Sequence, residues 1–154
     1  MPFISTALFR YVRTVFLMML IGFVTVPAAS AAVSDAKDRS VIGKWILAAT
    51  LDFADIASLD EIEAGRLVGR IVTISNEKLT FGELECTSPN FESERVEPGL
   101  YLRDRYHADV SELGLPNPVT VVHLDCTSVF LKDRNRLVFF WKGWFFDAKR
   151  VQGR

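Results

Sequence analysis

The chain has 154 residues, with 18 Lys and Arg against 19 Asp and Glu and a formal net charge of −1 at pH 7. This balance argues against a nucleic-acid-binding protein, which typically has a basic excess, and leaves no polybasic patch for an anionic membrane. With two histidines and two cysteines, the sequence contains no metal-ligand or cofactor motif. We therefore expect no metal, no cofactor and no nucleic-acid partner.

The first 31 residues have the three parts of a secretory signal peptide. Arg10 and Arg13 precede an apolar run over 15–26, and a small-residue site, Ala29-Ser30-Ala31, follows it. The run is shorter than the roughly 20 apolar residues of a membrane-spanning helix. We predict cleavage after Ala31, with an uncleaved anchor as the alternative. The mature chain is then periplasmic or secreted, carries 16 basic against 19 acidic residues, and has no stable membrane span.

The mature chain has the length of one compact domain. Residues 32–40 are polar and are predicted to form a flexible lead-in to a single domain over 41–152. Alternation of apolar residues over 43–51 predicts the first strand, with Trp45 and Leu51 on the same face.

A helix is predicted after this strand. The spacing of Ser58 and Glu61 matches a capping box, in which each side chain accepts a hydrogen bond from the other residue's backbone N–H. An amphipathic pattern follows over 59–68, and Gly69 is a typical helix end. The sequence predicts one short helix near residues 59–68.

The rest of the chain is dominated by short strands separated by turns. They are predicted over 70–75, 78–82 with an extension to Cys86, 91–96, 119–126, 128–132, 137–141 and 144–151. Residues 100–106 fit either a strand or the start of a helix, and Lys142-Gly143 fits a two-residue hairpin turn. This spacing predicts a mainly β domain, a small antiparallel barrel of seven or eight strands, with a β-sandwich as the alternative.

The hairpin over 139–146 carries large apolar side chains on both faces. One face must belong to the core. We expect the helix near 59–68 to cover the other face, because a short helix needs an apolar surface to pack on. The alternative is an exposed contact patch.

Cys86 and Cys126 are the only cysteines. An exported chain with one pair usually joins it as a disulfide, because the compartment is oxidising. We predict this bond. Two buried free thiols and a metal pair are the alternatives, and the metal pair has no C-x-x-C or C-x-x-H neighbour in its support.

The first strand opens with Gly43-x-Trp45, and the last strand ends at Arg150. This arrangement resembles lipocalins and other calycin-type barrels, in which the first-strand Trp packs at the closed end and a last-strand Arg lies across its indole. The resemblance implies a barrel-plug pair of Trp45 and Arg150, held by a cation–π contact. The alternative is an ordinary core Trp and a solvated Arg.

One segment combines charges with aromatic rings and is a candidate recognition loop. Its residues are Tyr101, Arg103, Arg105, Tyr106 and His107. Tyr and Arg are frequent anchors of protein interfaces. The alternative is a solvated loop or helix face.

His123 and Asp125 are two residues apart on a predicted strand and can hydrogen-bond on one face. An Asp–His pair with a serine would suggest a hydrolase triad. No serine lies in a G-x-S-x-G turn, so we assign no catalytic residue and expect a cross-strand polar contact. Glu92 and Glu94 are predicted to face water.

The sequence therefore favours an exported, non-enzymatic binding protein of the cell envelope with an envelope or extracellular protein partner. A hydrolase inhibitor, acting on a protease or a lysozyme, fits this description. The chain is similar in general plan to bacterial periplasmic metalloprotease inhibitors. The alternatives are a lipocalin-type carrier of a small lipophilic ligand, which the resemblance implies, and a structural envelope protein.

Overall fold

The computed structural model describes residues 36–109 and 111–153, so the predicted signal peptide over 1–31 lies outside the described residues. Ten strands form one antiparallel sheet. They are β1 (Ala36–Lys37), β2 (Gly43–Phe53), β3 (Ile71–Ile74), β4 (Lys78–Phe81), β5 (Leu84–Thr87), β6 (Glu92–Val96), β7 (Val119–His123), β8 (Ser128–Asp133), β9 (Arg136–Trp141) and β10 (Trp144–Arg150). A 3-10 helix, η1 (Arg39–Val41), and two α-helices, α2 (Glu61–Gly65) and α3 (Pro98–Tyr106), accompany the sheet.

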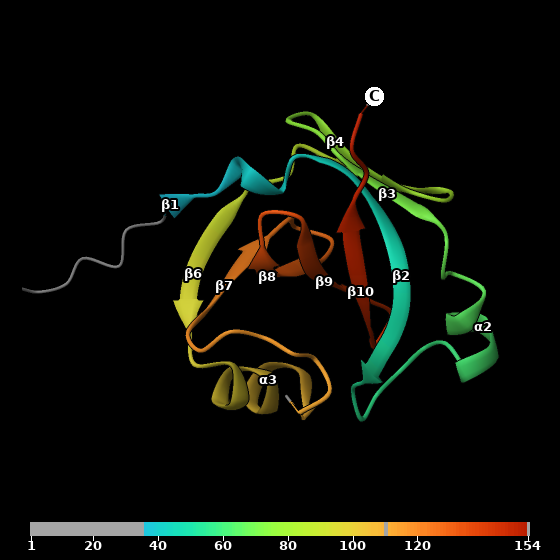
Figure 1. Ribbon diagram of the computed structural model, residues 1–154, viewed down its shortest axis with the longest axis vertical. Coiled ribbons are helices and arrows are strands. Elements are labelled where there is room, and N and C mark those ends of the chain that lie inside the picture. Colours follow the sequence, from blue (N-terminus) through green and yellow to red (C-terminus); the bar gives the residue numbers. More distant parts are fainter. Residues whose placement is uncertain (1–35, 110, 154) are drawn as a thin grey trace, which may run out of the picture. The chain divides into compact units, whose positions relative to one another are not determined.

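The sheet curls into a half-barrel (Figure 1). Its strand order is β1-β6-β7-β8-β9-β10-β2-β3-β4-β5, so β1 and β5 are its edges within the described residues. The mainly β antiparallel class is confirmed, but the strand count is ten rather than seven or eight. Two features account for the difference: β1 lies before the predicted first strand, and a turn at Gly82 separates β5 from β4, where we predicted a continuous strand.

The concave face of the sheet holds the main core. Strands that are distant in the sheet order contribute to it: the Phe81 ring on β4 lies 5.4 Å from the Phe139 ring on β9, centroid to centroid. Its buried members on the strands are Trp45, Leu47, Val72, Ile74, Leu79, Phe81, Val122, Val129, Leu137, Phe139, Trp144, Phe146 and Ala148. Large side chains therefore fill the interior of the curl.

A second core lies on the convex face of β7–β10, and α3 covers it. Leu102 of α3 is fully buried with Phe130, Phe145 and Val138 of the sheet. The prediction that the helix near 59–68 covers this face is wrong. That helix, α2, is only five residues long and packs against the first core through Ala64.

The start of α2 also differs from the predicted capping box. Asp60 rather than Ser58 is the N-cap: its carboxylate accepts from the Glu63 backbone N–H at 2.8 Å, and the Glu63 carboxylate accepts from the Asp60 N–H at 3.0 Å. The backbone N–H of Ser58 instead donates to the Lys142 carbonyl at 2.9 Å. This bond ties Ser58 to the β9–β10 turn. The N-cap therefore lies two residues after Ser58, at Asp60, and the helix begins at Glu61.

Part of the predicted lead-in over 32–40 belongs to the sheet. Ala36 and Lys37 pair with Ser93 and Glu92 of β6 as strand β1. The 3-10 turn that follows buries Val41 completely in the main core. The described chain is therefore anchored from its first residues.

Candidate functional site

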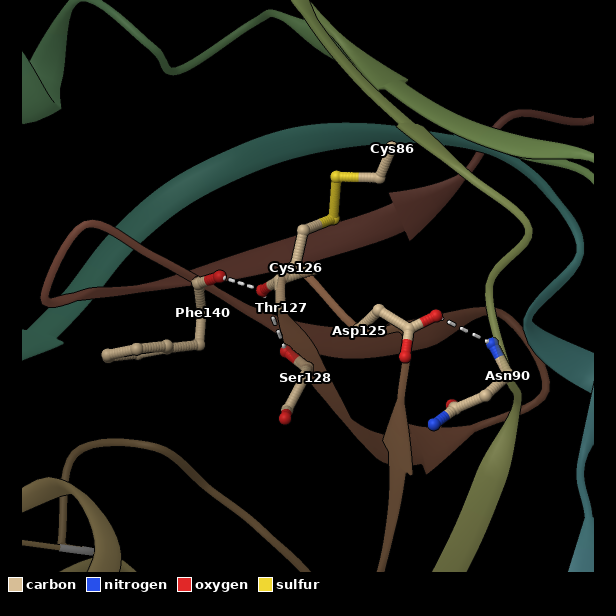
Figure 2. The surroundings of a disulfide bond; sticks show 7 residues. All are labelled: Cys86, Asn90, Asp125, Cys126, Thr127, Ser128 and Phe140. Carbon is tan, nitrogen blue, oxygen red and sulfur yellow. Dashed lines mark hydrogen bonds between the residues drawn. A yellow bond between two sulfur atoms is a disulfide. The ribbon is translucent and has the colours of Figure 1, made fainter.

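A disulfide joins the edge of the sheet to an internal turn (Figure 2). Cys86 on β5 and Cys126 in the β7–β8 turn are bonded, with their Cα atoms 6.3 Å apart and a sequence separation of 40. The predicted disulfide is confirmed. Such a bond is typical of proteins from an oxidising, non-cytoplasmic compartment.

The turn that carries Cys126 is held from two sides. Asp125 has a positive φ of 62°, and its carboxylate accepts from the Asn90 backbone N–H at 3.1 Å (Figure 2). The Thr127 hydroxyl donates to the Phe140 carbonyl on β9. These bonds and the disulfide fix the segment between β5 and β6 against the β7–β8 turn.

His123 lies beside this turn in a polar cluster, but its partner is not Asp125. Its Nδ1 lies 3.0 Å from the Ser128 hydroxyl, and its Nε2 lies 3.0 Å from a Glu94 carboxylate oxygen. The Tyr101 hydroxyl of α3 is 3.5 Å from the same Nε2. The expected cross-strand polar contact is present, since Glu94 and Ser128 lie on the strands that pair with β7. Asp125, which the spacing also allowed, is not the partner, because β7 ends at His123 and the left-handed Asp125 no longer follows the strand alternation.

A Ser–His–Glu chain has the order of a hydrolase triad. Ser128, however, is only 8% exposed and opens a regular strand, whereas a nucleophile elbow presents its serine on a sharp exposed turn. Burial raises the pKa of both Tyr101 and Tyr106, so these phenols stay protonated donors. The cluster is best described as a polar latch that ties α3 to β6, β7 and β8.

The candidate recognition residues lie on a helix, α3, rather than on a loop. The rings of Tyr101 and Tyr106 pack against the second core; the Tyr106 centroid is 4.6 Å from that of Phe140. Arg103 and Arg105 are exposed, and His107 ends the helix in a left-handed conformation. The helix thus separates the five residues: the rings stabilise the fold, and the guanidinium groups reach the surface.

Trp45 and Arg150 are in contact. The Arg150 guanidinium carbon lies 4.1 Å from the centroid of the Trp45 ring. The three nitrogens of Arg150 donate to backbone carbonyls of Arg134 at 2.9 Å, Ile42 at 2.8 Å and Ser40 at 2.6 Å. The indole Nε1–H of Trp45 donates to the Val41 carbonyl at 2.7 Å. The pair therefore joins η1 and β2 to β10 and the β8–β9 turn.

An acidic hollow lies at the other end of β2, and our sequence analysis did not identify it. Its volume is about 550 Å³. Its charged lining residues are all carboxylates: Asp52, Asp55, Asp60 and Glu61. Phe53 and Trp144 supply an apolar wall, with ring centroids 5.1 Å apart. The signal in the sequence was the run over 52–63, which contains five acidic residues and no basic one.

The segment that forms this hollow is rigidly held. The Ala54 N–H donates to the Gly143 carbonyl at 2.8 Å, and the Trp144 indole donates to the Leu59 carbonyl at 2.9 Å. Gly143 has a φ of +88°, and a Cβ atom there would lie 2.4 Å from the Ala57 Cα. The close approach of the β9–β10 turn therefore requires a glycine and fixes the shape of the loop.

Within the described residues, no group of three or more His, Cys, Asp or Glu side chains is arranged to hold a metal ion. None of the helices described is long and apolar enough to cross a membrane. Comparisons with protein-family models, with curated proteins and with solved structures found no match to this chain.

Proposed function

We propose that the chain is an exported, non-enzymatic binding protein that inhibits a basic hydrolase, a lysozyme or a protease, in the envelope or extracellular space. The observation that carries the proposal is the surface of the rigid 52–62 segment. Its large apolar side chains are exposed to water: Phe53 by 55%, Ile56 by 82% and Ile62 by 68%. We call this surface the 52–62 surface.

The chemistry of the 52–62 surface favours a cationic protein partner. Exposed apolar side chains on a fixed backbone supply the desolvated centre of an interface at low entropic cost. The four carboxylates beside them complement a positively charged partner and accelerate its association. Lys142, in the adjoining β9–β10 turn, does not line the hollow.

The packing of the concave face supports a protein ligand over a lipophilic one. A lipocalin-type carrier needs an empty barrel interior, whereas this interior holds the side chains of Phe139, Phe146 and Leu79. The contact of Trp45 with Arg150 supports a lipocalin-like plan for the closed end of the fold. The plan and the function are separate proposals.

Export through a cleaved signal peptide belongs to the same proposal. The Cys86–Cys126 bond supports it, because a disulfide persists outside the reducing cytoplasm. Periplasmic location and secretion are both compatible with a hydrolase target.

Inhibition assays with a basic c-type lysozyme and a basic trypsin-type serine protease test the proposal. We expect saturable 1:1 inhibition of at least one enzyme by residues 32–154. Ile56→Asp should raise the inhibition constant at least about tenfold, since a charge at the interface centre is desolvated.

Leu100→Asp is the matched control, because Leu100 is similarly exposed, at 58%, but lies on α3. It should leave inhibition unchanged. Failure to inhibit either enzyme, or equal losses in Ile56→Asp and Leu100→Asp, would overturn the proposal.

A further inference from the structure

A basic hollow lies at the opposite end of β10 from the acidic one. Trp144 at the start of this strand lines the acidic hollow, and Arg150 at its end lines the basic one. The basic hollow has a volume of about 590 Å³. Its charged lining residues are four cations and one carboxylate: Arg95, Lys132, Arg134, Arg150 and Asp133.

Two of these cations are already engaged within the fold. Each of the three guanidinium nitrogens of Arg150 donates a hydrogen bond to a backbone carbonyl. Lys132 donates to the buried Asp147 carboxylate at 3.1 Å. Their positions are therefore fixed. Arg150 has only neutral acceptors and keeps its charge at the wall of the hollow, whereas Asp147 balances the charge of Lys132.

The other two cations have free guanidinium groups. Among the described residues, neither Arg95 nor Arg134 forms an ion pair within 4.0 Å of a carboxylate. The one carboxylate of the lining, Asp133, accepts from the Asn135 backbone N–H at 2.7 Å. The lining consequently has a formal excess of three positive charges when Lys132 is counted without its partner Asp147, and the Arg95 and Arg134 guanidinium groups are available to a ligand.

The remaining lining is compact and largely apolar. Pro116, Pro118 and Leu131 form its apolar part, and Ser40 and Thr120 are its two uncharged polar residues. Such a wall suits the carbon skeleton of a small ligand, while the cations suit its charged group.

We propose that this hollow binds the phosphate group of a phosphomonoester. A planar guanidinium presents two parallel N–H donors that match two phosphate oxygens. Two free guanidinium groups therefore suit a doubly charged phosphate better than a singly charged carboxylate. The bound group would lie between Arg95 and Arg134, with the fixed charges of Lys132 and Arg150 beside it. The site is separate from the 52–62 surface and does not depend on the proposed inhibition.

Isothermal titration calorimetry of the protein comprising residues 32–154 with glycerol 3-phosphate, at low ionic strength, tests the site. We expect saturable 1:1 binding, at least about tenfold tighter than that of acetate. The double variant Arg95→Gln/Arg134→Gln should weaken binding at least about tenfold, because both forks are lost. Both arginines are exposed, so the variant should unfold at the same temperature as the natural chain.

Arg103→Gln/Arg105→Gln on α3 is the control, since it removes the same charge elsewhere and should not change binding. Vesicles with phosphatidic acid, compared with vesicles of phosphatidylcholine, distinguish a lipid headgroup from a free phosphomonoester. Binding to either phosphate source that is lost in Arg95→Gln/Arg134→Gln supports the site. The proposal would be overturned if neither phosphate source showed saturable binding, or if the control variant weakened binding equally.

Discussion

At the scale of single residues, Arg150 combines two roles that are usually separate. Its charge faces the Trp45 ring, and its donors satisfy carbonyls from the segments before β2 and before β9. A lysine has the charge but only one nitrogen, so it cannot make these bonds together. Gly43 belongs to the same arrangement: a Cβ atom there would lie 2.7 Å from the Arg150 Nη1. Gly43, Trp45 and Arg150 are therefore packed together in one arrangement.

Asp147 is a buried carboxylate whose pKa is set by two neighbouring cations. Its side chain is 6% exposed and accepts from Lys132 at 3.1 Å and from Arg136 at 3.0 Å. Burial alone would raise the pKa of Asp147, but the hydrogen bonds from Lys132 and Arg136 outweigh it and leave the pKa below its ordinary value. The ionised carboxylate is thus favoured by folding.

We predict that Asp147→Asn lowers the free energy of unfolding by about 3 kcal/mol at pH 7, because two cations lose their counter-ion. The folded pKa lies below the unfolded value of about 3.9, so this stability is full above that value. It is lost as the pH falls through the folded pKa. Urea unfolding from pH 7 to pH 2 measures the difference between the two proteins. A difference that stays constant over the whole range from pH 7 to pH 2 would contradict the assignment.

At the scale of elements, the disulfide is the main link across the open side of the sheet. It connects β5, one edge strand, with the β7–β8 turn, and no ladder joins β5 to β6 in the described sheet. We predict that Cys86→Ser/Cys126→Ser loses about 4 kcal/mol of unfolding free energy, the chain-entropy value for a loop of about 40 residues. Denaturant unfolding measures this loss.

The loss of the disulfide should destabilise the strands unequally. In the double variant, amide hydrogen exchange should accelerate most in β4 and β5, because β5 is the edge of the sheet and pairs only with β4 in the described sheet. Uniform acceleration over all strands would contradict the edge-closing role.

Hydrophobic alternation and turn chemistry predicted most strands, and the single cysteine pair of an exported chain predicted the disulfide. Three local features were not predicted. Glu97-Pro98-Gly99 has the composition of a turn, yet Glu97 caps α3 and Pro98 occupies its first turn. The backbone N–H groups of Gly99 and Leu100 lower the pKa of Glu97. A proline after an acidic residue marks a helix start as readily as a turn, and only the second core beneath α3 decides between them.

Strand β2 illustrates a different limit. Its pairing with β10 has two register shifts, so Trp45 faces the main core while Leu51 packs in the second core, although strict alternation places both on one face. A bulge adds a residue without a sequence signature of its own. For the same reason the acidic run over 52–63 was visible as composition, but not as a hollow: its shape depends on contacts with Gly143 and Trp144.

At the scale of the whole described unit, the curl of the sheet separates a concave face, a convex face and the two ends of β10. The concave face is filled by the main core, α3 covers the convex face of β7–β10, and the two ends of β10 open into hollows of opposite charge. The two proposed sites therefore lie at the ends of β10 rather than on the concave face or under α3. An acidic and a basic hollow thus lie apart in a chain whose formal net charge is −1.

The filled interior leads to the last prediction. A native protein whose concave face is packed should not take up a lipophilic molecule, so titration with a fluorescent fatty acid should give no saturable increase in emission. Phe139→Ala provides the matched test, because Phe139 is almost fully buried at the centre of the main core. Its truncation should cost about 3–5 kcal/mol and leave an apolar cavity of the kind that binds small apolar molecules. Binding of benzene by the variant alone, measured by calorimetry, would show that packing is what keeps ligands out. Stoichiometric fatty-acid binding by the natural chain would contradict this account and restore the carrier function.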